Sequence, residues 1–418
     1  MNPCFFPADI LLPDFTRTDG SRWAVVACDQ FTSEPNYWAG AIDTVGDAPS
    51  TLRLTLPEVW LSEAETRIPA INAAMHDALR DLLICHPNRM IFLDRTQSDG
   101  THRRGLIGAV DLEAYDYTRG AQTPIRATEG TVLERIPPRV AIRRDAPLEL
   151  PHVMLLIDDP DCTVIEPIFA RANELEVAYD FDLMLGGGHV CGRWLDDGAC
   201  RTAETALAKL GTVEEMEKKY GAAKAPLLFA VGDGNHSLAS AKATYEEIKA
   251  KLGDAALTHP ARYALVEVVN LHDSGLNFEP IYRVVFGVDP EDLLSELKTY
   301  AASLNGSVEG QKTEAVWANG SEIIPLPHAV QQLTVGTLQA FLDTYIKTHP
   351  DAEIDYIHGE SSLRTLAERP RAIGFLFEGM EKDQLFKTVL FDGALPRKTF
   401  SMGHAEDKRY YLEARKIR

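Results

Sequence analysis

The segment from Leu227 to Lys251 limits the possible folds of this chain more than any other, because it predicts a strand, a glycine-rich turn and a helix in immediate succession. Residues 227–231 are all apolar, which is typical of a buried strand. After the turn, apolar residues recur every three or four positions, as on one face of an amphipathic helix (Leu238, Ala241, Tyr245, Ile248, Leu252). Strand-like and helix-like patterns alternate through most of the chain, so we expect an α/β or α+β fold of mixed sheets with flanking helices.

The turn between this strand and this helix is suited to binding an anion, because its backbone N–H groups lie at the positive end of the helix dipole. We interpret all its residues as candidate phosphate-binding residues (Gly232, Asp233, Gly234, Asn235, His236, Ser237). Neutral His236 can donate to an anion or shuttle a proton near neutral pH. Asp233 would repel phosphate, so it is the candidate metal ligand, or else it orients His236 or accepts a hydroxyl proton. The competing explanation is a structural turn with an Asn or Ser cap.

Two other segments carry residues of the kind that catalysis uses. Asp29 follows a short strand pattern over residues 23–28, and open α/β sheets place their ligands at the C-terminal ends of strands. The segment 126–135 contains Arg126, Glu129 and Arg135, which lie close enough in sequence to converge on an anion and its hydroxylated substrate. The alternatives are a helix-flanking turn at Asp29 and a solvated loop at 126–135.

Length and composition set the class of protein. A chain of 418 residues predicts two or three domains, and we place the boundary between a first domain of residues 1–252 and a second α/β domain of residues 253–418. The net charge of −20 argues against broad binding of nucleic acid. No apolar run reaches the length of a membrane span, and the start of the chain does not resemble a signal peptide. Six scattered cysteines favour a cytoplasmic protein over a disulfide scaffold.

Several common active-site motifs do not occur in the sequence. It has no phosphate-binding loop of the Gly-x4-Gly-Lys-Ser/Thr type, no His-Glu-x-x-His zinc helix and no Gly-x-Ser-x-Gly elbow. The usual P-loop kinase, metalloprotease and esterase assignments therefore lose most of their support.

The residues 230–241 resemble the signature of the bacterial and archaeal domain-of-unknown-function family 1015, whose usual form is Ala-Asp-Gly-His-His-Arg followed by an alanine-containing helix. Further stretches are similar to that family's pattern in the same order along the chain (residues 27–30, 126–135, 155–160, 269–276, 280–283 and 395–398). The signature also resembles the phosphate-binding motif of the ParB/sulfiredoxin-like superfamily, which includes free-serine kinases. In those kinases the loop holds nucleotide phosphate, and an acidic residue activates the serine hydroxyl.

The resemblance assigns expected roles to individual residues. Asp233, Gly234 and His236 match the motif, whereas Asn235 stands where a histidine is usual and Ser237 where an arginine is usual. Loss of that arginine removes a bidentate phosphate clamp, which implies that another arginine supplies the charge (Arg126, Arg135 or Arg283). His236 would stabilise the phosphate charge. Asp29 is the first candidate for the general base, and Glu129 is the second.

Taken together, the turn and the resemblance predict a nucleotide-dependent phosphotransferase, that is, a small-molecule kinase. Its substrates would be ATP or ADP and a small hydroxylated metabolite such as free L-serine, and Mg²⁺ would bridge the phosphates. A non-catalytic regulatory protein that binds a nucleotide or metabolite and a phosphate-ester hydrolase are the alternatives. We expect no nucleic-acid or membrane partner, and a homo-oligomer stays open.

Overall fold

The computed structural model describes residues 4–32, 34–130, 136–221 and 225–418, and it divides into two compact units. The first unit comprises residues 1–127, 131–276 and 404–418, and the second comprises residues 128–130 and 277–403. The boundary that we placed after residue 252 falls inside the first unit. The reason is that β14 (Tyr263–Asn270) pairs with β6 (His102–Asp111) and β10 (Met154–Ile157) of the first unit's sheet.

The first unit is built on a mixed sheet that has ten strands within the described residues. The strand order is β11 (Val177–Asp182), β12 (His189–Trp194), β5 (Ile91–Thr96), β6, β14, β10, β13 (Phe229–Asp233), β8 (Ile125–Ala127) and β7 (Tyr115–Asp116), with β1 (Phe5–Phe6) beside β6. The pairs β10–β14, β13–β8 and β7–β8 are parallel, and the others are antiparallel. The expected mixed α/β class is therefore correct.

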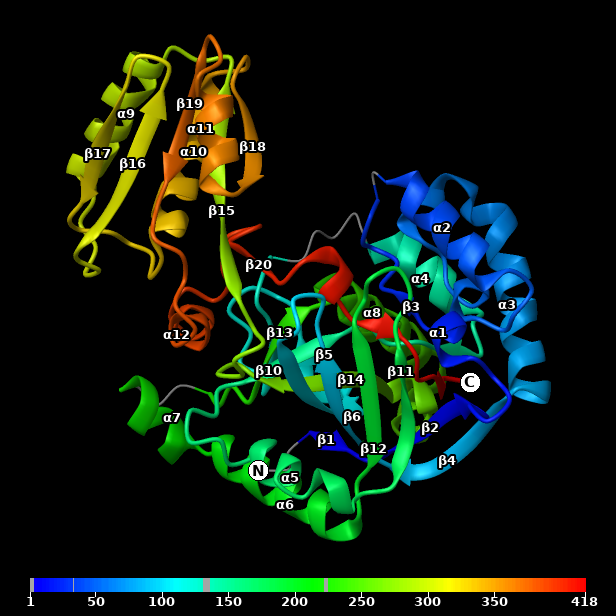
Figure 1. Cartoon of the computed structure of the whole chain (residues 1–418). Helices are drawn as coiled ribbons and strands as arrows, with labels where there is room; N and C mark the ends of the chain where they lie inside the picture. Colours follow the sequence, from blue (N-terminus) through cyan, green and yellow to red (C-terminus); the bar gives the residue numbers. More distant parts are fainter. Residues whose placement is uncertain (1–3, 33, 131–135, 222–224) are drawn as a thin grey trace. The chain divides into compact units, whose positions relative to one another are not determined.

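Both faces of this sheet are apolar, because successive side chains of its central strands point into two different hydrophobic clusters. On β6, Leu106 lies in one cluster and Ile107 in the other, and on β14 the same alternation separates Val266 from Leu265. Helices cover both faces, as Figure 1 shows for α2 and α3 and for α5 and α6. The helices of this unit are α1 (Gly20–Trp23), α2 (Pro35–Val45), α3 (Ala64–Asp81), α4 (Ile136–Arg144), α5 (Glu166–Phe169), α6 (Asp197–Leu210), α7 (Val213–Tyr220) and α8 (Asn235–Leu252).

Three short two-stranded ladders tie the ends of the first unit's chain to other parts of the unit or to each other. They are β2 (Ala8–Pro13) with β4 (Leu83–Arg89), β3 (Val25–Val26) with β21 (Tyr410–Tyr411), and β9 (Leu148–Glu149) with β22 (Arg415–Lys416). The β3–β21 ladder places residues near 410 beside residues near 28.

The second unit has its own antiparallel sheet, whose described part has six strands. The order is β17 (Gly320–Leu326), β16 (Gln311–Trp317), β19 (Ala372–Leu376), β15 (Phe278–Phe286) and β18 (Glu353–His358), with β20 (Phe400–Met402) beside β15. Its helices are α9 (Pro290–Ser303), α10 (Thr334–Thr348), α11 (Glu360–Ala367) and α12 (Gln384–Phe391). Val284, Val316 and Leu363 are among the residues that bury α11 against this sheet.

Within the described residues, no helix combines the length and the apolar character that a membrane crossing requires.

Candidate active site

The predicted strand, turn and helix are present as β13, Gly234 and α8. Leu238 and Tyr245 of α8 are fully buried against the sheet, which fixes the start of the helix at the end of β13. Gly234 has φ 76° and ψ 27°, a left-handed conformation that glycine adopts without strain. A Cβ at this position would lie 3.0 Å from the Cα of Val153, so the turn packs directly on the segment that precedes β10.

His152 stands at the centre of a group of polar side chains beside this turn. It is 7% exposed, and its Nε2 lies 3.1 Å from the hydroxyl of Ser237 in the first turn of α8. Its Nδ1 lies 3.1 Å from the hydroxyl of Tyr411, which belongs to β21. The Tyr411 hydroxyl also donates to the Cys28 sulfur at 2.9 Å. These contacts hold the imidazole in one orientation between the helix start and the strand end.

Asp29 joins the same group, because its Oδ2 lies 3.7 Å from Nε2 of His152. Gln30 donates to the other carboxylate oxygen at 3.1 Å. Burial by itself would raise the pKa of the Asp29 carboxyl, but His152, the Gln30 amide and Lys408 outweigh it and hold the pKa below its ordinary value. Asp29 is therefore ionised at neutral pH, with 30% of its side chain exposed to solvent.

The neighbouring thiol of Cys28 is not a nucleophile in this arrangement. Burial, followed by the charge of Asp29, raises its pKa to about 12. Since the thiolate is the reactive form of cysteine, this side chain is inert at neutral pH.

Lys408 supplies positive charge at the turn. Its Nζ lies 3.5 Å from Oδ2 of Asp233, and only 14% of its side chain is exposed. Asp233 also accepts a hydrogen bond from the backbone N–H of Gly234 at 2.9 Å. The Lys408 ammonium group, the Asp233 carboxylate and the start of an 18-residue helix therefore lie at one place in the first unit.

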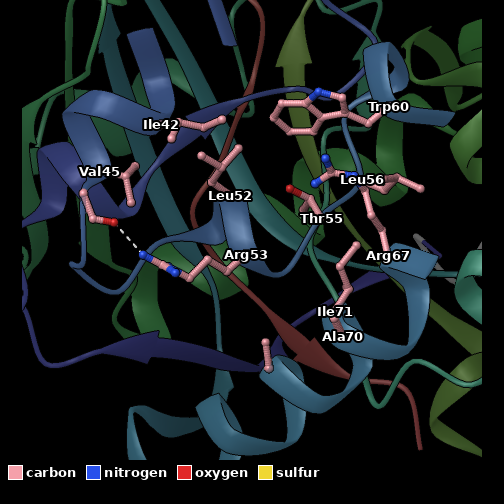
Figure 2. Close-up of a pocket in the computed structure, with 12 residues that line it drawn as sticks. Ile42, Val45, Leu52, Arg53, Thr55, Leu56, Trp60, Arg67, Ala70 and Ile71 are labelled. Atoms are coloured by element: carbon pink, nitrogen blue, oxygen red, sulfur yellow. Dashed lines mark hydrogen bonds between the residues drawn. The ribbon is translucent and has the colours of Figure 1, made fainter. Parts of the chain in front are cut away.

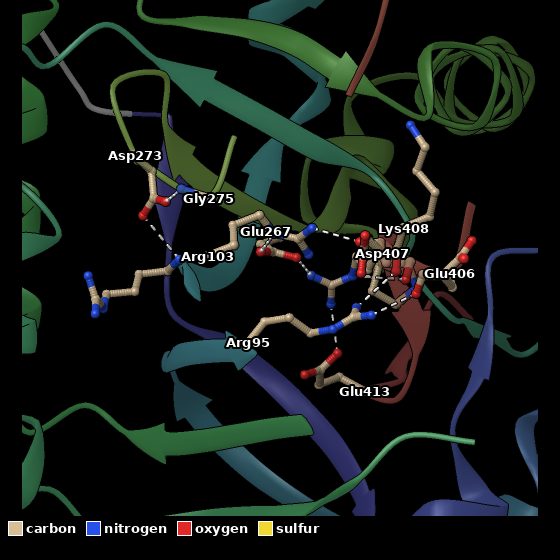
Figure 3. Close-up of polar contacts among 12 residues, drawn as sticks. Arg95, Arg103, Glu267, Asp273, Gly275, Glu406, Asp407, Lys408 and Glu413 are labelled. Carbon is tan, nitrogen blue, oxygen red and sulfur yellow. Dashed lines mark hydrogen bonds and ion pairs between the residues drawn. The ribbon is translucent and has the colours of Figure 1, made fainter. Parts of the chain in front are cut away.

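A buried ionic network holds the segment that carries Lys408 (Figure 3). Arg95 donates to the carbonyls of Glu406 and Lys408, both at 2.9 Å, and Arg103 donates to the carbonyl of Asp407 at 2.9 Å. The Asp407 carboxylate accepts from the N–H and the hydroxyl of Ser98, at 2.7 and 2.9 Å. Lys408 is thus fixed by backbone contacts on both sides of it.

The structure places most of the predicted site residues, but not all, at this group. The turn residues 232–237 form the end of β13 and the start of α8, with His236 half-buried in the first helical turn. Asp29 reaches the helix start through His152 and Ser237. Arg135 falls outside the described residues.

The other predicted arginines are occupied by backbone carbonyls. Arg126 is buried and donates to the carbonyls of Thr123 and Ala225, at 2.8 and 2.7 Å, and burial lowers its pKa to about 10. Arg283 belongs to the second unit, where it is fully buried and donates to the carbonyls of Lys398 and Arg397. Glu129 also belongs to the second unit, in which it forms a β-bridge with Leu395. Arg126, Arg283 and Glu129 are therefore not part of the group of side chains around His152.

Sequence reasoning missed His152, Tyr411 and Lys408. None of them lies in a glycine-rich or otherwise distinctive stretch, and two of them arrive from the last eleven residues of the chain. The apolar run Tyr410-Tyr411-Leu412 is compatible with a strand, but nothing in the local sequence indicates its partner.

Over residues 14–416 the chain matches the family described as "Protein of unknown function (DUF1015)". The chain belongs to the DUF1015 family. The resemblance drawn from the turn and from the ordered short motifs is therefore confirmed. No match to the chain was found among the curated proteins compared with it.

Several solved structures are similar to this DUF1015 protein at low identity. A mutant of a free serine kinase in complex with ADP is 11% identical, with a TM-score of 0.39, and the match covers 74% of this chain and 91% of that one. A conserved hypothetical protein from Pyrococcus furiosus is 11% identical, with a TM-score of 0.34 and coverage of 72% and 96%. SbnI with a C-terminal truncation, from Staphylococcus aureus, is 11% identical, with a TM-score of 0.34 and coverage of 71% and 82%.

Proposed function

We propose that this DUF1015 protein is a nucleotide-dependent phosphotransferase acting on a small hydroxylated metabolite, with free L-serine as the first acceptor to test. One observation carries the proposal. The ionised carboxylate of Asp29 lies 3.7 Å from His152, which contacts Ser237 at the start of α8 at 3.1 Å. A proton acceptor and a helix N-terminus suited to phosphate are thereby brought together from positions more than 200 residues apart.

In the proposed reaction, the chain's own residues bind charge and move one proton. Asp29 accepts the proton of the acceptor hydroxyl as that oxygen bonds to the terminal phosphorus of ATP or ADP. The bond between this phosphorus and its bridging oxygen breaks, and ADP leaves when the donor is ATP, or AMP when the donor is ADP. Lys408 and the helix start stabilise the negative charge on the transferring group, with His236 as a further donor. His152 keeps Asp29 ionised and oriented.

Mg²⁺ is the cofactor expected for this chemistry, and Asp233 is the residue proposed to hold it. Within the described residues there is no group of three or more His, Cys, Asp or Glu side chains that would form an all-protein metal site. Mg²⁺ does not require one, since it is commonly held by one or two carboxylates together with substrate phosphates. Asp233 fits this pattern, and the ion would neutralise phosphate charge when bound.

The test is formation of O-phosphoserine by the full chain with Mg²⁺, L-serine and either ATP or ADP. Asp29→Asn removes the proton acceptor and should lower kcat about 10²–10⁴-fold. Asp43→Asn is the matched control, because Asp43 is an exposed aspartate on α2. Lys408→Gln should raise the nucleotide KM about tenfold, since a hydrogen bond to a charged group contributes about 1.5–3 kcal/mol. Lys408→Arg should restore most of the affinity.

Other outcomes select the alternatives. Nucleotide binding in calorimetry without any product would favour the regulatory protein, and the serine that replaces the motif's arginine at position 237 is the observation in its favour. Release of inorganic phosphate without an acceptor would favour the hydrolase. The absence of both nucleotide binding and product formation would overturn the proposal.

A further inference from the structure

Away from the candidate active site, the first unit has a cavity of about 390 Å³ between α2, the loop of residues 46–60 and α3 (Figure 2). This volume lies within the range of small-molecule binding sites, about 300–1,000 Å³. We call this space the α2–α3 cavity.

The walls of the α2–α3 cavity are apolar, and several of the residues that line it are small. Ile42 and Val45 come from α2, and Leu52 and Leu56 come from the loop. On α3, the small Ala70 and Ala74 line the space together with the larger side chains of Arg67 and Ile71. Ile42 is 47% exposed although it is apolar, and an apolar ligand in the cavity would cover it.

Two arginines line the same cavity, and no carboxylate does. Arg67 lies over the ring of Trp60, with 4.5 Å from its guanidinium carbon to the ring centre, and its Nε donates to Glu63 at 2.9 Å. Arg53 donates from one terminal nitrogen to the carbonyl of Gly46 at 2.5 Å. A guanidinium group has five N–H donors, so both arginines retain donors for an anionic oxygen. In a chain of net charge −20, the two arginines give the lining positive charge, of which Glu63 offsets the part that Arg67 contributes.

We propose that the α2–α3 cavity binds a hydrophobic carboxylate, whose apolar body lies against Leu52, Leu56 and Ile71 and whose carboxylate is held by Arg67 beside Trp60 (Figure 2). The apolar walls favour transfer of the ligand's hydrocarbon part from water. The planar fork of arginine matches the geometry of a carboxylate, which selects this anion over an uncharged head group.

Decanoate is the probe, with 1-decanol as its uncharged counterpart, and binding to the full chain is measured by calorimetry and by the fluorescence of Trp60. Decanoate should bind saturably and at least about tenfold more tightly than 1-decanol, because charged hydrogen bonds contribute about 1.5–3 kcal/mol. Trp60→Phe should remove the fluorescence change while the heat of binding persists. Equal binding of both compounds, or no saturable binding of decanoate, would overturn the proposal.

Paired variants on α3 locate the site. Ala74→Leu places a larger side chain in the cavity and keeps a good helix former, so it should abolish decanoate binding while the far-ultraviolet circular dichroism stays unchanged. Ala73→Leu is the matched control, because residue 73 is exposed and does not line the cavity. Arg67→Gln should weaken binding about tenfold. Arg80→Gln, which removes an exposed arginine from the same helix, should leave decanoate binding unchanged. Loss of binding in both members of a pair, or in neither, would contradict this location.

Discussion

At the residue scale, Gly234 is a position in the candidate active site where backbone conformation and packing both demand glycine. Gly234→Ala would introduce a Cβ 3.0 Å from the Cα of Val153 in a left-handed conformation. The conformation alone costs about 1–2 kcal/mol for a residue with a side chain. The close contact is with backbone, which cannot rotate away, so we expect a larger loss in the free energy of unfolding, measured by urea denaturation.

Gly221→Ala is the matched control for this substitution. Gly221 has φ 70° and ψ 13°, close to the values of Gly234, but a Cβ there would have no described heavy atom within 4 Å. It should therefore show the conformational cost alone. Equal losses for the two variants would mean that the turn moves easily away from Val153, contrary to the packing described above.

At the element scale, the segment of residues 404–411 positions Lys408 and Tyr411, and Asp407 is its side-chain anchor. Asp407→Ala removes two hydrogen bonds to Ser98, one to the backbone N–H and one to the hydroxyl. A hydrogen bond to a charged group contributes about 1.5–3 kcal/mol, and water can reach the exposed Ser98 once the carboxylate is gone, so we expect a loss of about 1–3 kcal/mol in the free energy of unfolding. Phosphotransfer, if it is observed, should also weaken, because Lys408 is the next residue.

Glu406→Ala is the control for the loss of a carboxylate from this segment. Its backbone carbonyl, which Arg95 contacts, is kept by the substitution, and its side chain is only partly buried. We expect a change below about 0.5 kcal/mol, as for most surface substitutions. A loss as large as that of Asp407→Ala would indicate that charge rather than the contact with Ser98 holds the segment.

The elements that the sequence predicts well are those whose signal is local. The apolar run before Gly232 and the helical spacing after it lead to β13 and α8 within about two residues of their observed bounds. The position of Lys408 depends instead on β21 pairing with β3 and on Arg95 and Arg103, contacts that join residues about 300 or more positions apart. Periodicity within a window of 20 residues contains no information about such partners.

At the scale of the whole molecule, the same limitation affects the division into units. The composition near residues 253–260 predicts a boundary there, yet the chain adds β14 to the first sheet before it leaves at residue 276, and it returns at residue 404. The first unit therefore needs the last fifteen residues of the chain. Trp23, for example, donates to the carbonyl of Leu412 at 2.9 Å in the buried core.

Glu267 connects β14 to the returning segment of residues 404–418, through its ion pair with Arg409. It lies on β14 with no exposed surface, 3.4 Å from Nε of Arg103 and 3.0 Å from a terminal nitrogen of Arg409. Burial would raise the pKa of its carboxyl, but the charges of Arg103, Arg409 and Arg95 outweigh it and hold the pKa below its ordinary value. A group whose pKa is lower in the folded state stabilises the fold when ionised.

This stabilisation should be complete at neutral pH. It should be lost progressively as the pH falls below about 4.3, the pKa of an unperturbed glutamate, and then through the lower pKa of Glu267 in the folded state. Glu267→Gln removes the buried carboxylate that pairs with Arg103, whereas Arg409 keeps Glu413, so we expect it to lower the free energy of unfolding at pH 7 by about 3–5 kcal/mol. Because the variant has nothing to protonate at this position, the difference between it and the natural chain should shrink as the pH falls from 5 to 3.

Urea denaturation of both chains across this pH range measures that difference. Glu174→Gln is the control, since Glu174 forms an exposed ion pair with Arg171 and should change the free energy of unfolding by no more than about 1 kcal/mol at any pH. A constant difference between the natural chain and Glu267→Gln from pH 7 to pH 3 would show that Glu267 does not titrate with folding. In that case its contribution would come from packing, and the returning segment would be held mainly by the backbone contacts of Arg95 and Arg103.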